Sequence, residues 1–398
     1  MRLQPFLVAG AIVIVVVLLG ALMMSLSAPS SYSLPKAGVN VTLPASVPYK
    51  QITTGTWDNR YPVWSPNGSS IAYISDKEGL WSVWVMNASG SSPEQVSTPG
   101  PLAMFPTWSP DSSKLSYWFM DGLESGYEVV DLGSLTASRV TPDNITALQG
   151  PAQWSPDGTM LAFFVNPGQP QLVVSNVSSG EMETVANASG SLVSASWSSN
   201  DQLYYSTSVN GWYSIMSVNL LTGASGVVVG GGSDFVDPVA GPNGTLAYFS
   251  DYQPPVVAQL MLGGGGYNIW FAGADGSNAT YQSQMSVVSE AQPNVMVPVP
   301  YVPGLTDLSS IPVWSPDGTK VAYVATSSLF SSTFVWNTVA ASTASLGPVQ
   351  AGVNVVDPSW SPDSVNLAFS CNMTGTYQIW VGNTAGVGES QVNIGPGY

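Results

Sequence analysis

Carboxylates are the side chains of this chain whose type and position could do chemistry. Asp237 and Asp357 stand at equivalent positions ahead of predicted β-strands, and each is followed directly by proline. Paired carboxylates can hydrolyse glycosides by acid and base catalysis, and oxygen clusters can hold Ca²⁺, which takes six to eight oxygens. Aspartate before a strand is also an ordinary turn residue. The aspartates ahead of predicted strands are Asp58, Asp143, Asp234, Asp237, Asp307 and Asp357.

The composition excludes several other kinds of site. The chain has no histidine and one cysteine, Cys371, so neither a Ser-His-Asp or Cys-His device nor a His/Cys zinc site can form. Cys371 is expected to be a small core residue on a strand. With 24 acidic and 8 basic residues the net charge is −16, which argues against a nucleic-acid partner. No cofactor is expected, and binding of a metal is left open.

The elements that must position these carboxylates come from an internal repeat. Its copies read like WSPDGTMLAF and begin at Trp64, Trp108, Trp154, Trp197, Ala240, Trp314 and Trp360. Successive copies start 43 to 46 residues apart, except for 74 between Ala240 and Trp314. A period near 40–45 residues is typical of a four-stranded propeller blade.

Each repeat divides into four predicted strands, A to D. Strand A ends on the Trp, Ser-Pro-Asp-Gly fills a type I turn, and strands B, C and D follow. The sequence therefore predicts an all-β, seven-bladed propeller of four-stranded antiparallel blades over residues 49–398. The repeated Trp residues are expected to pack between blades, and Asp111, Asp157, Asp317 and Asp363 to be turn residues.

This repeat resembles the WD40-like propeller repeat of the TolB family, which also occurs in prolyl-oligopeptidase-type peptidases. The resemblance covers nearly all of residues 49–398 and implies architecture more than function. The α/β domain of TolB and the hydrolase domain of the peptidases have no counterpart here. Sialidases are also propellers, but their Asp-containing turn has a different order of residues, and they need an arginine cluster that this chain lacks.

The ring can close in two ways. Residues 49–54 (YKQITT) and residues 390–394 (SQVNI) both look like an outermost strand. We favour residues 49–54 as the strand that completes the last blade, because one contact then locks the ring and covers an edge.

The N-terminus predicts export. Residues 1–5 are a cytoplasmic N-terminus, 6–26 an uncharged apolar anchor long enough to span a membrane as a helix, and 27–48 an extracellular linker. A signal peptide cut near Ser27 is the alternative. Asn-X-Ser/Thr triplets fit a glycosylated protein of the cell surface, and an archaeal surface fits better than a bacterial one. They lie at Asn40, Asn67, Asn87, Asn144, Asn176, Asn187, Asn243, Asn278 and Asn372.

Two insertions explain the long gap between repeats, at residues 253–266 and 291–305. Because strands alternate in direction, the B–C and D–A connections that carry them share one face, here called the insertion face. Long apolar loops tend to mark partner contacts, although they can also pack on their own blade. The predicted binding residues are Asp237, Asp357, Asp58, Asp307, Tyr301, Leu260 and Met261.

Three functions remain open at this level. The first is a membrane-anchored, non-enzymatic scaffold that binds an envelope protein, peptide or glycan. The second is an extracellular polysaccharide hydrolase or lyase that uses Asp237 and Asp357. The third is a structural subunit of a surface layer. The first is the expectation, and the oligomeric state is left open.

Overall fold

The computed structural model describes residues 46–143, 145–147, 150–166, 169–187, 192–252, 268–282, 311–326, 331–340, 342–348 and 350–385. All of these residues belong to one compact unit, Pro44–Tyr398.

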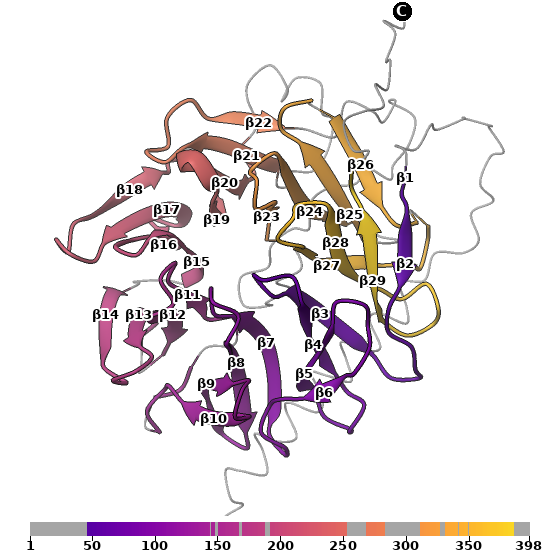
Figure 1. Cartoon of the computed structure of the whole chain (residues 1–398). Helices are drawn as coiled ribbons and strands as arrows, with labels where there is room; N and C mark the ends of the chain where they lie inside the picture. The colour runs from indigo at the N-terminus through magenta and orange to yellow at the C-terminus, as the bar shows by residue number, and fades with distance from the viewer. Residues whose placement is uncertain are drawn as a thin grey trace, which may run out of the picture. The chain divides into compact units, whose positions relative to one another are not determined.

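Seven antiparallel sheets follow one another around a ring, each with its first strand innermost (Figure 1). Blade 1 consists of β3 (Asn59–Trp64), β4 (Ser70–Ser75), β5 (Ser82–Asn87) and β6 (Glu94–Gln95). Blade 2 consists of β7 (Leu102–Trp108), β8 (Lys114–Asp121), β9 (Glu124–Asp131) and β10 (Thr136–Arg139). Blade 3 consists of β11 (Gln153–Trp154), β12 (Met160–Val165), β13 (Gln171–Asn176) and β14 (Met182–Asn187). Blades 4 and 5 consist of β15 (Leu192–Ser199), β16 (Gln202–Val209), β17 (Trp212–Asn219) and β18 (Ser225–Val229); and β19 (Phe235–Ala240), β20 (Thr245–Ser250), β21 (Asn268–Gly273) and β22 (Thr280–Gln282). Blades 6 and 7 contain β23 (Val313–Trp314), β24 (Lys320–Thr326), β25 (Ser331–Asn337) and β26 (Ser342–Leu346); and β27 (Val355–Trp360), β28 (Asn366–Cys371) and β29 (Gln378–Asn383). The predicted seven-bladed, all-β architecture is therefore confirmed.

The ring closes through the N-terminal side of the propeller. Strand β2 (Tyr49–Gln51) pairs antiparallel with β29 and becomes the fourth strand of blade 7, as the favoured alternative predicted. Just before it, β1 (Ser46–Val47) pairs in parallel with β26 and gives blade 6 a fifth strand. Residues 390–394, the other closure candidate, lie outside the described residues.

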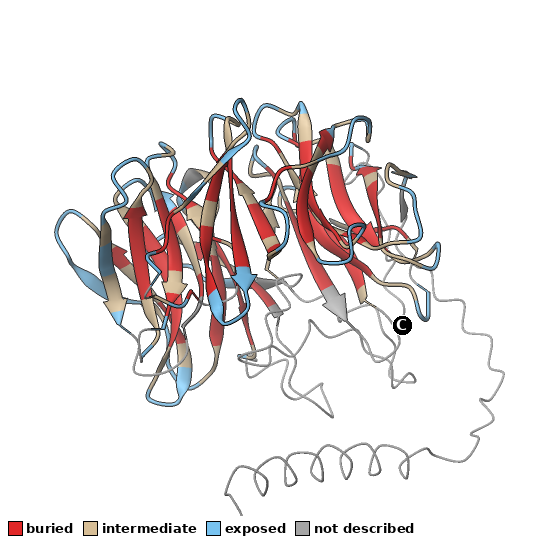
Figure 2. Ribbon diagram, turned by 90° about the horizontal axis from the view of Figure 1, so that it is seen from below, coloured by how far each residue is buried: buried red, intermediate tan, exposed pale blue. Residues whose placement is uncertain are grey.

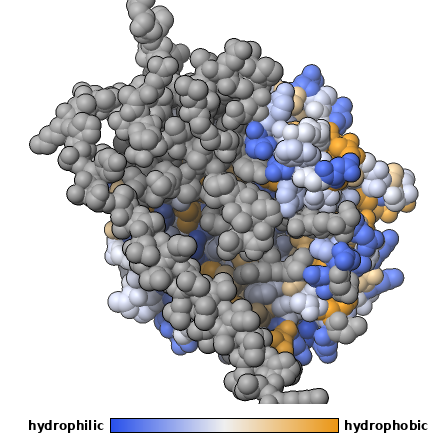
Figure 3. Space-filling model, turned by 180° about the vertical axis from the view of Figure 1, so that it is seen from behind, coloured by the Kyte–Doolittle hydropathy of each residue, from blue (hydrophilic) through white to orange (hydrophobic). Residues whose placement is uncertain are grey.

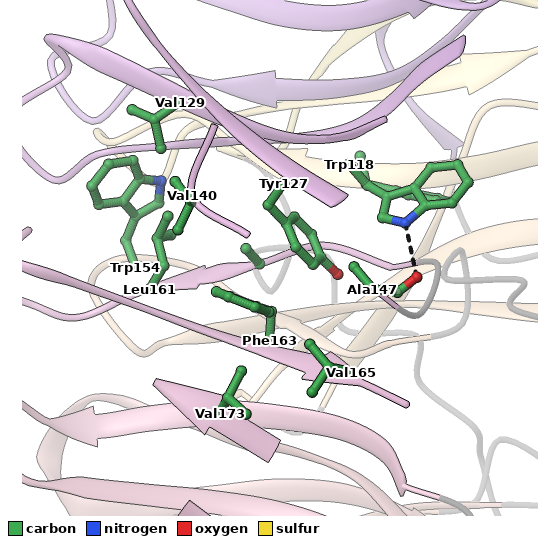
Figure 4. Packing of buried hydrophobic residues seen from close by; sticks show 12 residues of the cluster. Trp118, Tyr127, Val129, Val140, Ala147, Trp154, Leu161, Phe163, Val165 and Val173 are labelled. Atoms are coloured by element: carbon green, nitrogen blue, oxygen red, sulfur yellow. Dashed lines mark hydrogen bonds between the residues drawn. The ribbon is translucent and has the colours of Figure 1, made fainter. Parts of the chain in front are cut away.

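The hydrophobic core is divided into seven clusters, and each lies between two neighbouring blades. Buried side chains run along the strands, while the turns at both ends are exposed (Figure 2). In the cluster between blades 2 and 3, Trp154, Phe163 and Tyr127 pack together, and the Trp118 indole lies near the Ala147 carbonyl at 3.5 Å (Figure 4). The cluster between blades 7 and 1 joins Ile379 to Tyr73, so apolar packing continues across the closure.

The repeated tryptophans belong to this scaffold, as the sequence predicts. The Trp108 indole N–H donates to the carbonyl of Val63 in the preceding blade at 2.9 Å. Trp154, Trp197 and Trp360 make the same inter-blade bond with Thr107, Gln153 and Val313. Each of these four Trp residues therefore buries its ring between two blades and also forms a hydrogen bond to the innermost strand of the preceding blade.

On the face seen in Figure 3, the described residues are mostly polar, with apolar patches between the polar side chains. In the parts of the chain that the structure describes, no helix is long and apolar enough to cross a membrane. The predicted anchor, residues 6–26, lies outside those parts, so the structure does not support the N-terminal transmembrane helix of the predicted fold class.

Candidate functional site

Four innermost strands share a local distortion that sets the position of both candidate carboxylates. The residue three positions before the repeat Trp, or before its Ala240 counterpart, has a left-handed backbone and precedes proline. These four bulge residues are Tyr61, Phe105, Asp237 and Asp357, with φ of 52°, 55°, 53° and 57°. The ladder skips a step at each of them. Because proline cannot donate to the ladder and a bulge turns one side chain aside, the Asp-Pro pairs re-aim their carboxylates.

Asp237 is held in an apolar and neutral setting. Only 3% of the residue is exposed, on β19 of blade 5. Burial raises the pKa of its carboxyl to about 6, and a hydrogen bond with Ser194 of blade 4 offsets part of that shift. The desolvated charge is thus disfavoured, and the acid keeps its proton at mildly acidic pH.

Asp357 has a charged partner. Arg60 of blade 1 donates from Nε to Asp357 Oδ2 at 3.3 Å, and the Asp357 side chain is 1% exposed. The Arg60 guanidinium also lies 4.6 Å from the ring centroid of Tyr377 and 5.6 Å from that of Tyr61. This ion pair offsets the cost of burying the Asp357 charge. Two equivalent aspartates therefore have opposite electrostatic surroundings.

Asp58 and Asp234 tie neighbouring blades together on the insertion face. The Asp58 carboxylate accepts from the Tyr377 N–H at 2.7 Å, and its own N–H donates to Asp76 Oδ1 at 2.8 Å. Asp234 repeats both contacts with Tyr213 and Asp251, each at 2.8 Å. Asn354 does the same with Ser331 and Asn372. The carboxylate of Asp58, a predicted binding residue, is thus engaged in scaffold bonds.

The aspartates of the A–B turns are engaged in the same way. Asp157 Oδ1 accepts from the Ser155 hydroxyl at 2.7 Å and from the Thr159 N–H at 3.0 Å. Such bonds hold the pKa of Asp157 below its usual range, and the hydroxyl of Ser155 contributes most. Asn67 fills the same place in blade 1, so an amide oxygen serves equally well. Asp143, in the blade 2–3 connection, pairs with Arg139 at 2.9 Å.

The remaining predicted binding residues, Asp307, Tyr301, Leu260 and Met261, lie outside the described residues, as do both insertions in full. Sequence reasoning missed Arg60, Tyr377 and Ser194 as neighbours of the carboxylates. One signal in the sequence could have pointed to Arg60. Arginine is scarce in this chain, and Arg60 stands immediately before a bulge residue.

Two further predictions can be compared with this geometry. Within the described ranges, no three His, Cys, Asp or Glu residues gather closely enough to hold a metal ion. Among the glycosylation candidates, Asn67, Asn87, Asn187 and Asn278 are exposed, and Asn176 and Asn372 are half-buried. Asn40 and Asn144 lie outside the described residues, and the side chain of Asn243 is not described. Glycosylation stays a prediction.

The repeat itself decides the family. The model of the TolB beta propeller domain matches residues 62–277, more than half of the chain. The chain belongs to this family. The TolB propeller family also includes TolB itself: the protein from Acinetobacter baumannii is 16% identical with a TM-score of 0.51, over 77% of this chain and 67% of that one.

Solved enzymes share the architecture of this TolB-family propeller. Oligogalacturonate lyase from Vibrio parahaemolyticus is 14% identical with a TM-score of 0.63, over 86% of this chain and 95% of that one. A puromycin-hydrolyzing peptidase from Mycobacterium tuberculosis is 13% identical with a TM-score of 0.62, over 86% of this chain and 54% of that one. At these identities the likeness shows the fold alone.

These structures correct the expectation that the chain is not an enzyme. That expectation relied on the missing catalytic domain and on the lack of histidine. The lyase is matched over 95% of its length, so a propeller of this kind can make up nearly the whole of an enzyme. The absence of an appended domain is therefore no ground for excluding catalysis.

Proposed function

We propose that this TolB-family propeller is an exported protein that binds a neutral polysaccharide and hydrolyses it beside the innermost strands of blades 5 to 7. The observation that carries the proposal is the pair of Asp-Pro bulges. Asp237 and Asp357 occupy one structural position in two blades. Asp237 is buried with no charged partner among the described residues, whereas Asp357 is paired with Arg60. Carboxylates whose surroundings separate their proton affinities are the mark of an acid and base pair.

The two carboxylates then have distinct roles. Asp237, with a pKa of about 6, gives its proton to the glycosidic oxygen as the bond to the sugar breaks. Asp357, which is paired with Arg60, accepts the proton of the attacking water. The oxygen of that water bonds to the anomeric carbon, so one water is consumed for each bond cleaved.

Charge restricts the substrate. The oligogalacturonate lyase suggests an extracellular polysaccharide, but a net charge of −16 would repel a polyuronate, and only eight basic residues are present in the whole chain to bind one. A neutral glycan avoids this repulsion and matches a surface whose polar groups are mostly uncharged.

The same proposal includes the location. The apolar residues 6–26 would hold the propeller at the outer side of a membrane, and exposed sequons at Asn67, Asn87, Asn187 and Asn278 support an extracellular, glycosylated protein. In this arrangement Tyr301, Leu260 and Met261 of the insertions, together with Asp307 just after the second insertion, would contribute to substrate binding on the insertion face.

The test is to incubate the full chain with neutral and with acidic polysaccharides and to measure hydrolysis by the release of reducing ends. Both carboxylates are buried, so the proposal requires that the substrate reaches the bulges. Asp237→Asn removes the proton that Asp237 would transfer to the glycosidic oxygen. We expect a loss of about 100-fold or more in turnover for Asp237→Asn and Asp357→Asn.

Asp157→Asn is the matched control, because it changes a turn carboxylate into the amide that blade 1 uses at Asn67. Its turnover should equal that of the unchanged protein. Since Asp357→Asn also breaks a buried ion pair, Asp237→Asn is the deciding variant. Equal turnover of Asp237→Asn and Asp157→Asn would refute the proposed role of Asp237.

A further inference from the structure

Asp237 meets the residue at the corresponding position of the preceding blade. Ser194 stands three residues before Trp197, just as Asp237 stands three residues before Ala240. The β15–β16 ladder skips a step around Ser194, and the β19–β20 ladder skips a step at Asp237. A skipped step turns a side chain out of the regular alternation of a strand. Two such irregularities therefore face each other on neighbouring innermost strands (Figure 1), and a hydrogen bond joins Ser194 to Asp237.

A second hydroxyl lies behind Ser194. The Oγ atoms of Ser194 and Ser206 are 3.2 Å apart, and either atom can be the donor of this hydrogen bond. Both serines are buried, as Asp237 is. A hydroxyl donates one hydrogen bond and accepts others, whereas a carboxyl donates only when it is protonated. Asp237, Ser194 and Ser206 therefore form a buried hydroxyl chain from blade 5 into blade 4, in which each bond can reverse its direction.

The strands around Asp237 bring no charge to this hydroxyl chain. Strands β15, β16, β17 and β20 pack on β19, and none of the four contains a charged residue. Tyrosine, which ionises near pH 10, is the titratable residue type on them. These tyrosines are Tyr204, Tyr205, Tyr213 and Tyr248. Asp234 and Asp251, just beyond the ends of β19 and β20, are not among the causes that shift the pKa of Asp237. The protonation of Asp237 is thus coupled to hydroxyl groups.

We propose that Ser194 and Ser206 are positioning residues for Asp237, whose two hydroxyls turn together when Asp237 gains or loses its proton. When Asp237 is protonated, its O–H donates to Ser194 Oγ, and Ser194 donates to Ser206. When Asp237 is ionised, Ser206 donates to Ser194, and Ser194 donates to the carboxylate. Neither serine gives up a proton in either state. The hydroxyl chain satisfies a buried carboxyl in both of its forms, which a fixed donor cannot do.

The inference rests on the proposed function, in which Asp237 gives its proton to a glycosidic oxygen. The transfer leaves a buried carboxylate, and the reversed hydroxyl chain then supplies it with a charge-assisted hydrogen bond. This bond favours the ionised form, so it lowers the pH at which Asp237 releases its proton. Asp357 is served differently. The corresponding residue of its preceding blade is Ile311, which has no hydroxyl, and Arg60 is the partner instead.

The pH dependence of unfolding tests the hydroxyl chain without any substrate. Each serine variant of the full chain is compared with the same variant carrying Asp237→Asn, and the midpoint of the pH-dependent loss of stability is read from the difference. Ser194→Ala should move this midpoint upward by about one pH unit, because the carboxylate loses a hydrogen bond. Ser206→Ala should move it in the same direction by a smaller amount, since Ser194 can still donate to Asp237.

Thr207→Val is the matched control. Thr207 follows Ser206 on β16, is buried, and its hydroxyl has no hydrogen-bond partner in the described part of the chain. Its midpoint should equal that of the unchanged protein. Equal midpoints for Ser194→Ala and Thr207→Val would overturn the proposal, as would a downward shift in Ser194→Ala.

Turnover of a neutral polysaccharide against pH separates this inference from the proposed function. If both hold, the alkaline limb of the turnover profile moves upward in Ser194→Ala together with the unfolding midpoint, and it stays in place in Thr207→Val. If the midpoint moves while the turnover profile does not, or while no polysaccharide is hydrolysed, the hydroxyl chain is supported and the role of Asp237 as the acid is refuted. An unfolding midpoint that stays in place in Ser194→Ala overturns the hydroxyl chain, whatever the turnover.

Discussion

Four repeats share one left-handed bulge conformation, and in two of them the residue that adopts it is an aspartate. Aspartate tolerates a left-handed backbone better than most residues, so the Asp-Pro bulges of blades 5 and 7 need little compensation. Tyr61 and Phe105 hold the same conformation and contact each other, with ring centroids 5.4 Å apart. The bulge is therefore a property of the repeat, and the side chain placed on it decides whether the position is apolar or acidic.

Burial of Asp237 predicts a pH dependence of stability. Its pKa is raised from 3.8 to about 6, so the protonated form stabilises the fold below pH 4, and this contribution is lost as pH rises through 6. Asp237→Asn stays neutral at every pH. Relative to this variant, the unchanged protein should lose about 3 kcal/mol of unfolding free energy between pH 4 and 8.

The measurement is urea unfolding of both proteins at several pH values. Subtracting the two curves removes the contribution of the turn aspartates, because those residues are common to both. A difference that stays constant from pH 4 to 8 would show that Asp237 ionises as an ordinary exposed carboxyl.

At the scale of the element, the innermost strand is the unit that joins blades. Its Trp donates to the previous blade, and Ser359 at the adjoining position of blade 7 accepts the Trp64 N–H at 3.0 Å. The indole N–H of Trp64, however, has no hydrogen-bond partner. The indole N–H of the repeated Trp is therefore hydrogen-bonded in some blades and not in others. The sequence of one repeat does not show this difference.

This difference predicts unequal costs for the same substitution. Trp108→Phe removes the bond to the Val63 carbonyl, whereas Trp64→Phe removes an indole N–H that bonds nothing. Both variants lose similar apolar area. Trp108→Phe should therefore cost about 1 kcal/mol more in unfolding free energy than Trp64→Phe. Chemical denaturation of the pair measures it, and equal losses would argue against the inter-blade bond.

The whole molecule is closed at one seam, where β2 from the N-terminal side of the propeller completes blade 7 beside β29. Gln378, which is 1% exposed, is the centre of that seam. Its Oε1 accepts from Thr53 Oγ1 and Asn59 Nδ2, each at 2.9 Å, and its Nε2 donates to the Trp57 carbonyl at 2.9 Å. These bonds join residues more than 300 positions apart in the chain.

Gln378→Ala should therefore loosen the ring at one place. We expect a loss of about 3 kcal/mol in unfolding free energy, since three or more buried polar groups lose their partners. Gln171→Ala is the matched control, because Gln171 also begins the third strand of its blade but bonds on the surface.

Hydrogen exchange locates the effect. Amides of β2, β29 and β3 should exchange faster in Gln378→Ala, while those of blades 3 and 4 stay protected. Uniform acceleration over all blades would indicate that the seam is no weaker than the other six junctions.

The sequence by itself determined the repeat, its turns and the number of blades, and it reduced the closing strand to two candidates, of which the structure shows residues 49–51 in place. These features are local or periodic: Ser-Pro-Asp-Gly forms its turn from its own side chains, and the Trp recurs at the blade period. Both carboxylates are also visible as Asp-Pro pairs three residues before Trp360 and before Ala240, its counterpart in blade 5. The equivalence of Asp237 and Asp357 was therefore readable without a structure.

Only the tertiary structure decided which side chains lie next to these two carboxylates. The neighbour of a bulge residue belongs to the next or the previous blade, and the ring alone determines which side chain meets it. Ser194 reaches Asp237 from the blade before, whereas Arg60 reaches Asp357 across the closure, 297 residues away in sequence. Because burial and charge at so short a range set the proton affinity of a carboxyl, identical sequence positions became electrostatically opposite sites only when the ring closed.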